Sequence, residues 1–406
     1  MFYFLKRADF KNLIKALDDR WEVFLPVKNS YGDVRFERFG EGFTDLSLID
    51  FKSQTLIPPK EVFFPQSEVM FKYSESGKSG LTIETESEIN PSKPKLIFGV
   101  KPCDYNAIMI TDRFFIGNER GYVDYYYELK ASKSLIIIAA CLTPPEPDAC
   151  FCTSSGTGPF LEKEKGDSYD IQIIEIKGNE NGFNEGFIVE TASDRGEDFI
   201  AENESFFESL DEVNTREMIV DLRERAIKNV QLKLDFRGAI EKIASGYGLK
   251  GYGPKASLPK DNGLSENTKT GGKANINVRS DIFDIYERIA DRCIYCGACL
   301  YACPTCSCFN VYDNSNSNSQ GTPEGERVRV WDGCVFSGYT REASGHNPRD
   351  EAYKRAARRY EHKLFYDVEL YGRSSCVGCG RCLTACPVDI GMSKFIEELS
   401  RKKLLK

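Results

Sequence analysis

Two copies of one cysteine pattern constrain this chain more than any other feature. The first copy is Cys293-x2-Cys296-x2-Cys299-x3-Cys303-Pro304, and the second is Cys376-x2-Cys379-x2-Cys382-x3-Cys386-Pro387. This spacing is typical of proteins that hold two [4Fe–4S] clusters, in which one short loop aims three thiolates at a cluster and the fourth cysteine reaches the other cluster. We therefore assign one cluster to Cys293, Cys296, Cys299 and Cys386, and the second to Cys376, Cys379, Cys382 and Cys303.

Disulfide bonds and structural zinc are the alternatives to clusters. Cysteines this close in sequence rarely bridge to one another, because the geometry of a disulfide does not fit such short intervals. Structural zinc usually takes two Cys-x2-Cys pairs separated by a longer loop. Each fourth cysteine is expected to begin a helix, since the following proline suits a first helical turn.

The composition favours a redox or metal protein and argues against several other classes of protein. The chain has 406 residues, fifteen cysteines, a net charge of −8 and 41% hydrophobic residues. So many cysteines in a cytoplasmic, reducing compartment indicate metal or redox work, and the negative charge argues against nucleic acid as a partner. The longest apolar run, 135–142, is too short to span a membrane, and the N-terminus lacks the features of a signal peptide. With only His346 and His362 present, histidine acid–base catalysis is not expected.

The first 245 residues read as an α/β domain. Residues 95–100 and 135–140 are expected to be buried, parallel strands, and 171–176 and 187–190 show further β signals. A helix is expected through residues 107–114, with Asp104 as its N-cap, and helical spacing covers 215–244.

The rest of the chain is expected to be a linker, 246–279, and a mainly α-helical dicluster ferredoxin-like domain, 280–406. A helical stripe should deliver Cys293, and the polar insert 314–320 should be a solvated surface loop. Helices are also expected over 350–364 and 389–404. The former carries five basic residues, which we interpret as a solvated outer face, with docking of an acidic partner as the alternative: Lys354, Arg355, Arg358, Arg359 and Lys363.

Four further cysteines lie in the first domain. Cys103 and Cys141 each follow a predicted strand, and the carboxyl ends of parallel strands line the ligand crevice of such a sheet. Cys150 and Cys152 lie on the loop that leaves the second strand. These four either hold a third [4Fe–4S] cluster or another metal, or pack as small buried groups.

Three cysteines remain, Cys306, Cys308 and Cys334. With His346 they could form a fourth metal site, but three cysteines are one short of a regular cluster. We favour a role beside the neighbouring clusters, where sulfur and N–H groups adjust the reduction potential.

Several stretches together resemble one family. They are the segments 98–104 (Phe98-Gly99-Val100-Lys101-Pro102-Cys103-Asp104), 150–152, 303–306, 331–334 and 345–349. From about residue 60 onward the chain resembles the dicluster electron-transfer proteins of the anaerobic sulfite reductase and sulfhydrogenase β-subunit family. The resemblance implies electron transfer between a flavoprotein that binds NAD(P), which would also carry the FAD, and a catalytic siroheme sulfite reductase or [NiFe] hydrogenase subunit. The long linker and the polar insert depart from that pattern.

The leading interpretation is therefore an electron relay with no catalytic residues of its own. No G-x-G-x-x-G follows a strand and no Walker A sequence is present. An alternative is a flavin-bearing subunit that oxidises a reduced deazaflavin or nicotinamide at the crevice of Cys103 and Cys141. A redox sensor ranks last, because the sequence contains no recognisable output domain.

Overall fold

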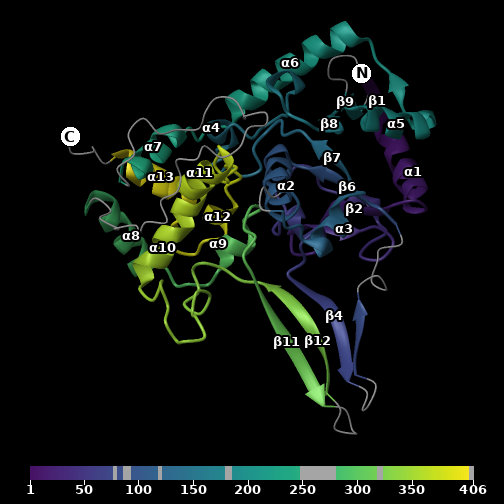
Figure 1. The fold of residues 1–406 in the computed structure, drawn as a ribbon. Helices are drawn as coiled ribbons and strands as arrows, with labels where there is room; N and C mark the ends of the chain where they lie inside the picture. Colours follow the sequence, from purple (N-terminus) through teal and green to yellow (C-terminus); the bar gives the residue numbers. More distant parts are fainter. Residues whose placement is uncertain are drawn as a thin grey trace.

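The computed structural model describes residues 1–75, 80–85, 93–117, 121–178, 185–246, 280–317 and 323–401. An eight-stranded mixed sheet forms the body of the molecule (Figure 1). Its four central strands are parallel and its outer strands antiparallel. In spatial order the strands are β10 (Glu208–Ser209), β1 (Phe2–Lys6), β9 (Gly186–Thr191), β8 (Ile171–Ile176), β7 (Leu135–Ala139), β6 (Lys95–Val100), β2 (Glu22–Lys28) and β3 (Val34–Arg38).

Helices cover both faces of this sheet, as the alternation of its buried side chains requires. On one face, α1 (Arg7–Asp18) and α5 (Asp194–Glu202) pack against a core that includes Leu96 and Phe98. The neighbouring Ile97 points to the other face. There, the covering helices are α2 (Pro102–Phe115), α3 (Tyr125–Ala131) and α6 (Glu212–Asn229). The expected parallel pairing of β6 with β7 is confirmed.

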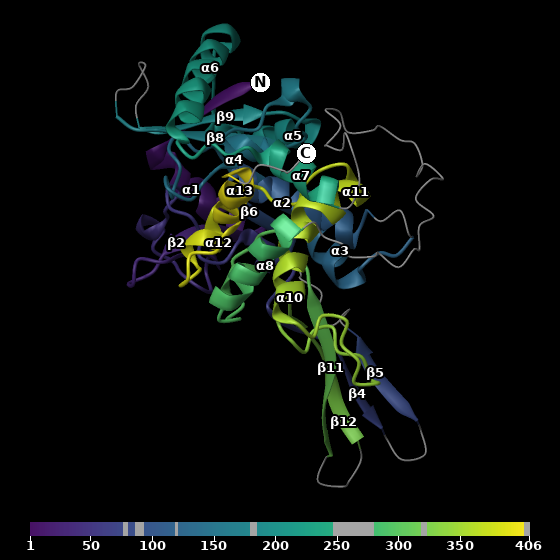
Figure 2. The same cartoon turned by 90° about the vertical axis from the view of Figure 1, so that its left-hand side faces the viewer.

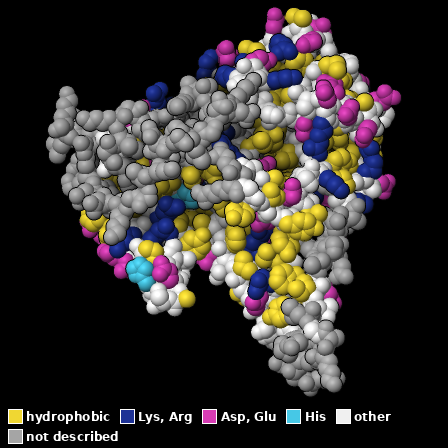
Figure 3. Space-filling model, in the orientation of Figure 1, with side chains coloured by type: hydrophobic (Ala, Val, Ile, Leu, Met, Phe, Trp, Pro, Cys, Tyr) yellow, Lys and Arg dark blue, Asp and Glu magenta, His cyan; other side chains and the backbone are white. Residues whose placement is uncertain are grey.

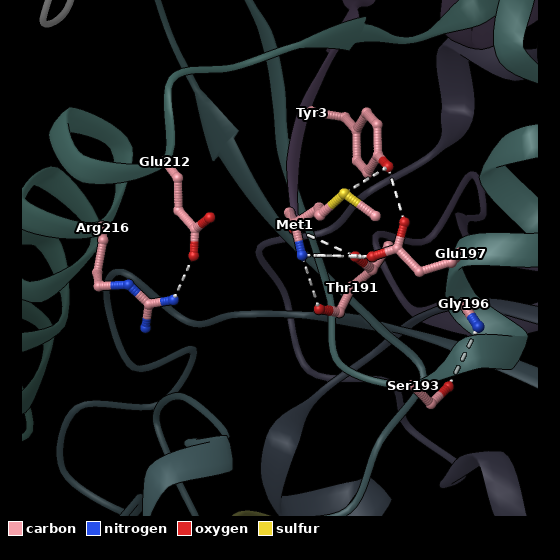
Figure 4. Close-up of polar contacts among 8 residues, drawn as sticks. All are labelled: Met1, Tyr3, Thr191, Ser193, Gly196, Glu197, Glu212 and Arg216. Carbon is pink, nitrogen blue, oxygen red and sulfur yellow. Dashed lines mark hydrogen bonds and ion pairs between the residues drawn. The ribbon is translucent and has the colours of Figure 1, made fainter.

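The start of β1 is fixed to α5 through Glu197. One carboxylate oxygen lies 3.3 Å from the amino group of Met1, and the other accepts a hydrogen bond from the Tyr3 hydroxyl at 2.7 Å (Figure 4). Thr191 also donates to this carboxylate. These contacts tie the neighbouring strands β1 and β9 to the helix that covers them.

The second half of the chain contributes a helical bundle. Four helices share its apolar core, and Phe151 also packs into this core. Although α7 lies largely before the boundary expected at residue 245, it packs into this core. The four helices are α7 (Phe236–Gly246), α8 (Ser280–Arg292), α10 (Ala352–Glu361) and α13 (Met392–Arg401). A π-helical turn (His362–Tyr366) and α11 (Asp367–Tyr371) continue α10.

A four-stranded antiparallel sheet extends from the body as an arm, visible in both orientations (Figures 1 and 2). It combines two hairpins that are distant in sequence, so the C-terminal half is not built from helices alone. The prediction of a solvated loop at 314–320 is wrong for residues 314–317, which belong to a strand. Residues 318–320 lie outside the described residues. The strands are β11 (Phe309–Ser317), β12 (Pro323–Trp331), β4 (Ser67–Glu75) and β5 (Leu81–Thr85).

The base of the arm is buried against the body. Arg329 of β12 is 1% exposed and pairs with Glu68 of β4 and with Asp124 before α3. Trp331 packs with Phe64 in the same core. Hydrophobic side chains are also visible on the surface near this junction (Figure 3). The arm is therefore anchored by both apolar packing and a buried charge network.

Three local expectations are corrected. Asp104 does not cap α2, since that helix begins at Pro102 and the aspartate lies inside its first turn. The 215–244 helix is interrupted, with α6 and α7 separated by residues 230–235. The prolines after the fourth cysteines lie in turns rather than in first helical turns. The predicted linker lies, apart from Gly246, outside the described residues, as do 402–404 of the last expected helix.

No helix in the described segments combines the length and the apolar character that a membrane crossing requires.

Candidate iron–sulfur sites

The two cysteine motifs adopt the same local structure. In each, a glycine with positive φ precedes a one-turn helix that carries the third cysteine: Gly297 (φ 76°) before α9 (Ala298–Tyr301), and Gly380 (φ 80°) before α12 (Arg381–Thr384). A Cβ at Gly380 would lie 2.7 Å from the carbonyl carbon of Ala149, so the loop also approaches its neighbour too closely for a larger residue. The repeated sequence therefore produces a repeated loop that turns three cysteines around one point.

The first site collects the four cysteines assigned to it from the sequence. Cys293 follows α8, and together with the next two cysteines of its motif it lines a cavity that Cys386 closes from the second motif. The Tyr295 N–H donates to the Cys293 sulfur at 3.4 Å. Most of the other lining residues are apolar, and Cys296 is exposed at the rim. This is a thiol-lined site at the protein surface.

The cysteines of the second site are more deeply buried than those of the first site. Burial raises the pKa of Cys376 to about 12, with the nearby Cys382 as the next contribution. Burial also raises the pKa of Cys379 well above its ordinary value, and the charges of Cys303 and Cys382 act in the same direction. The Met392 N–H donates to the Cys382 sulfur at 3.3 Å. Cys303 therefore lies with the second motif and Cys386 with the first, which is the crossed arrangement that the spacing predicts.

The donor set suits iron–sulfur clusters better than single ions. Among the described residues, no three His, Cys, Asp or Glu side chains converge as the ligands of one ion do. In a [4Fe–4S] cluster each thiolate binds a different iron atom, so its four sulfur ligands lie farther apart than those around a single zinc ion. Burial disfavours the free thiolates, and metal binding would displace their protons. The residues present therefore fit two clusters.

The prediction that the helix over 350–364 presents a solvated basic face is wrong for three of its five basic residues, and two of these three lie beside the sulfurs. Arg355, Arg359 and Lys363 are buried. Lys363 donates to the Thr305 hydroxyl at 2.7 Å, and that hydroxyl lies 3.4 Å from the Cys303 sulfur. Although burial opposes it, the proximity of Cys303 and Cys306 raises the pKa of Lys363 well above its ordinary value. This lysine is a fixed positive charge beside the second site.

Arg359 lies between the two sites. Its side chain is 6% exposed, it lines the first cavity, and its Nε has no hydrogen-bond partner in the described parts of the chain. Burial alone would lower its pKa, but Cys299 of the first site and, more weakly, Cys382 of the second raise it well above the ordinary value. A buried guanidinium is costly unless an anion faces it, and a cluster with its thiolates is such an anion.

The sequence contains a signal for these cations. Arg355, Arg359 and Lys363 recur every four residues, so they share one side of the helix, directly beside the apolar stripe of Ala356, Tyr360 and Leu364. Lys60, from the 3-10 turn Pro59–Val62, could not have been found in this way. It donates to the Cys306 carbonyl at 2.6 Å, and burial lowers its pKa to about 8.

The three additional cysteines lie near the two sites, with Cys306 beside Cys303 of the second site and Cys334 packed with Cys299 of the first. Cys306 shares a hydrogen bond with Cys303, while Cys334 lies buried near Cys308. Burial raises the pKa of Cys334 to about 11. His346 is exposed, and its backbone N–H bonds to Ser344 within the same turn. Nothing in this arrangement joins His346 to the cysteines, so a role next to the clusters stays the simpler prediction.

The four cysteines of the first half lie where the sequence places them relative to the strands. Cys103 is in the first turn of α2 and Cys141 follows β7. Cys150 precedes α4 (Cys152–Ser155), which begins with the fourth cysteine. All fifteen cysteines are free thiols, which disfavours the disulfide alternative.

Comparison with known proteins agrees with this geometry. Residues 292–390 match the 4Fe-4S dicluster domain family, a range that begins one residue before Cys293 and includes Cys386. The chain is also 28% identical to Sulfhydrogenase 2 subunit beta of Pyrococcus furiosus over 391 residues, which cover 96% of each protein. These matches agree with the resemblance seen in the sequence: the chain is similar to a sulfhydrogenase β-subunit and contains a 4Fe-4S dicluster domain, which together support an iron–sulfur electron-transfer subunit.

Proposed function

We propose that this chain conducts electrons between a flavoprotein subunit that handles NAD(P) and a catalytic subunit of the [NiFe] hydrogenase or sulfite reductase type. The observation that carries the proposal is the crossed exchange of fourth cysteines, because it requires two four-thiol sites to lie side by side. The name of the P. furiosus relative supports a hydrogenase-type complex. In this proposal the catalytic residues belong to the partners, and this chain supplies none.

The ligands we propose are those assigned from the sequence, with Cys293, Cys296, Cys299 and Cys386 at the first site and Cys303, Cys376, Cys379 and Cys382 at the second. Bound clusters supply one-electron redox changes with little rearrangement of their surroundings. The protein holds the thiols in place and sets the local charge through Arg359 and Lys363. The exposed Cys296 and Ile294 put the rim of the first site within reach of a partner.

A flavin bound by this chain is disfavoured by what occupies the crevice at the ends of β6 and β7. Cys103 packs there against Val377 and Cys379 of the second motif. The Phe151 N–H donates to the Gly378 carbonyl at 2.8 Å, which closes the loop of residues 149–157 over the same place. We therefore place the FAD on the partner. We propose an α/β domain and a cluster domain as the two domains, with α7 packing into the cluster domain although it lies before the boundary expected at residue 245.

The test is a Cys296→Ser variant of the full chain, purified anaerobically and combined with its partners. Because Cys296 is exposed, its loss should leave the fold intact while removing a ligand of the first site. We expect a reduced iron content, the loss of one cluster signal in electron paramagnetic resonance, and electron transfer from NAD(P)H to the catalytic partner slowed at least about tenfold.

The matched control is Asp291→Asn, which changes an exposed residue two positions before the motif. It should keep the iron content and the rate of electron transfer. Unchanged electron transfer in Cys296→Ser, despite loss of the cluster signal, would overturn the relay. Flavin released from the isolated wild-type chain on denaturation would instead support the flavin-bearing alternative.

A further inference from the structure

Cys103, Cys141, Cys150 and Cys152 come from three separate segments, yet the structure brings them to one place. Gly158 lies between two of these segments: a Cβ at this glycine would be 3.4 Å from Cβ of Pro102 and 3.5 Å from the Cys152 sulfur. The Cys141 N–H donates to the Pro159 carbonyl at 3.0 Å, which holds the end of β7 at the same point. The first turn of α2, the end of β7 and the start of α4 therefore meet around these thiols.

The electrostatics of the thiols indicate the same proximity. Burial raises the pKa of Cys103 well above its ordinary value, and nearby charges of Cys379, Cys152 and Cys141 add to the effect. Burial also raises the pKa of Cys152 to about 12, with Cys141 and Cys150 as the next contributions. Each of the four thiols is thus close enough to at least one of the others to affect its ionisation.

This group directly adjoins the second cluster site. The Cys150 thiol donates to the backbone carbonyl of Cys379 at 3.5 Å, and the Thr157 hydroxyl donates to the Val377 carbonyl at 2.6 Å. On the other side, Gln54 donates to the same Cys379 carbonyl at 2.7 Å. Cys379 is therefore a backbone and side-chain bridge between the two groups of thiols.

The local charge supplies an independent reason to expect an anion. Arg381 is neutralised by Asp104, but the buried Lys101 faces no carboxylate among the described residues. Its ammonium donates to the Phe51 carbonyl and lies beside Cys141, where it partly offsets the rise in thiol pKa caused by burial. A buried ammonium whose partners are a neutral carbonyl and a thiol is costly, whereas a thiolate-ligated cluster beside it would compensate the charge.

We propose that a third [4Fe–4S] cluster binds at this place, with Cys103, Cys141, Cys150 and Cys152 as its ligands. The scattered thiols do not converge as around a single ion, and four cysteines complete the ligand set of a cubane cluster. The three cluster sites would then form one path. It would run from the third site past Cys379 to the second site, and from there to the first site, where Cys296 is exposed. Only this order depends on the proposed relay; the metal site stands on its own residues.

The experiment measures iron, acid-labile sulfide and zinc per chain in the anaerobically purified full-length protein, with spin quantitation after complete reduction. We expect about twelve iron atoms and close to three spins in the wild type. In Cys152→Ser, about four iron atoms and one spin should be lost, while the signals of the other two clusters persist. Thr153→Ala, one residue away on the same helix, should retain all three.

The wild-type measurement decides the matter even if Cys152→Ser fails to fold. About eight iron atoms and two spins in the wild type would overturn the third cluster while leaving the relay intact. Eight iron atoms with one zinc ion would also overturn it, and would assign the thiols to zinc instead. Twelve iron atoms in a chain that transfers no electrons would keep the third cluster and reject the relay.

Discussion

Asp104 and Arg381 form a two-pronged ion pair inside the protein, with Nη1 to Oδ1 at 2.5 Å and Nη2 to Oδ2 at 2.7 Å. The aspartate belongs to the first turn of α2, and the arginine opens the helix that carries Cys382. Arg381 also donates from Nε to the Thr55 carbonyl at 2.8 Å. The α/β body is thereby fixed to the second cluster loop by a rigid, fully hydrogen-bonded contact.

Breaking this pair from one side should be strongly destabilising. In Asp104→Asn the buried guanidinium loses its counter-charge, so we expect the free energy of unfolding to fall by about 3–5 kcal/mol. Anaerobic chemical denaturation, followed by circular dichroism, measures the change. The double variant Asp104→Asn, Arg381→Met removes both charges and should recover part of the loss. A single variant as stable as wild type would contradict the structural role of the pair.

Arg359 should control the reduction potentials of the clusters. Reduction adds negative charge, and a buried positive charge next to Cys299 and Cys382 stabilises that charge. We therefore expect Arg359→Met to lower the midpoint potentials of both clusters, with iron content unchanged, in a redox titration followed by electron paramagnetic resonance.

The adjacent Arg358 provides the control for this substitution. It is only partly buried and lies over the Tyr366 ring, 4.4 Å from its centroid. Arg358→Met should leave the potentials close to those of wild type. If the two variants shift the potentials equally, Arg359 has no special place between the sites.

Much of the site could be predicted from the sequence because the residues that define it are close together along the chain. Ligand spacing is set by one loop, so Cys293, Cys296 and Cys299 could be grouped without knowledge of the rest of the fold. The strands that precede Cys103 and Cys141 are recognisable for the same reason, since a continuous apolar run indicates a buried strand.

The surroundings of the site could not be predicted, because they depend on distant segments. Lys60 meets Cys306 across 246 positions, and β4 pairs with β12 across about as many. The insert at 314–317 is polar because its strand projects into solvent on the arm, which removes the apolar alternation that signals a strand. The prediction for Arg359 is wrong because charge on a helix usually indicates exposure, whereas here the balancing groups are thiols.

Asp112 should give the protein a measurable pH dependence. Burial raises its pKa from 3.8 to about 6, although the Tyr127 hydroxyl donates to it at 2.6 Å and opposes the shift. The folded state thus binds this proton more tightly than the unfolded chain, and the stabilisation is lost as the pH rises through about 6. Compared with Asp112→Asn, wild type should lose roughly 1 kcal/mol of stability between pH 5 and 7. Parallel stability profiles for the two proteins would exclude this role.

Gly380 should be essential for the second site but not for the overall fold. Its φ of 80° and the close approach of Ala149 leave no room for a side chain, so Gly380→Ala must shift the loop that carries Cys379 and Cys382. We expect loss of about four iron atoms per chain, with the first cluster retained because its own loop is separate. The comparison is Gly372→Ala, which also has positive φ (71°) but has no heavy atom within 4 Å of the added Cβ. It carries the same backbone strain without the clash, so it should keep its iron. Full iron content in both variants would show that the loop tolerates displacement, and equal loss in both would attribute the effect to backbone strain rather than to contact with Ala149.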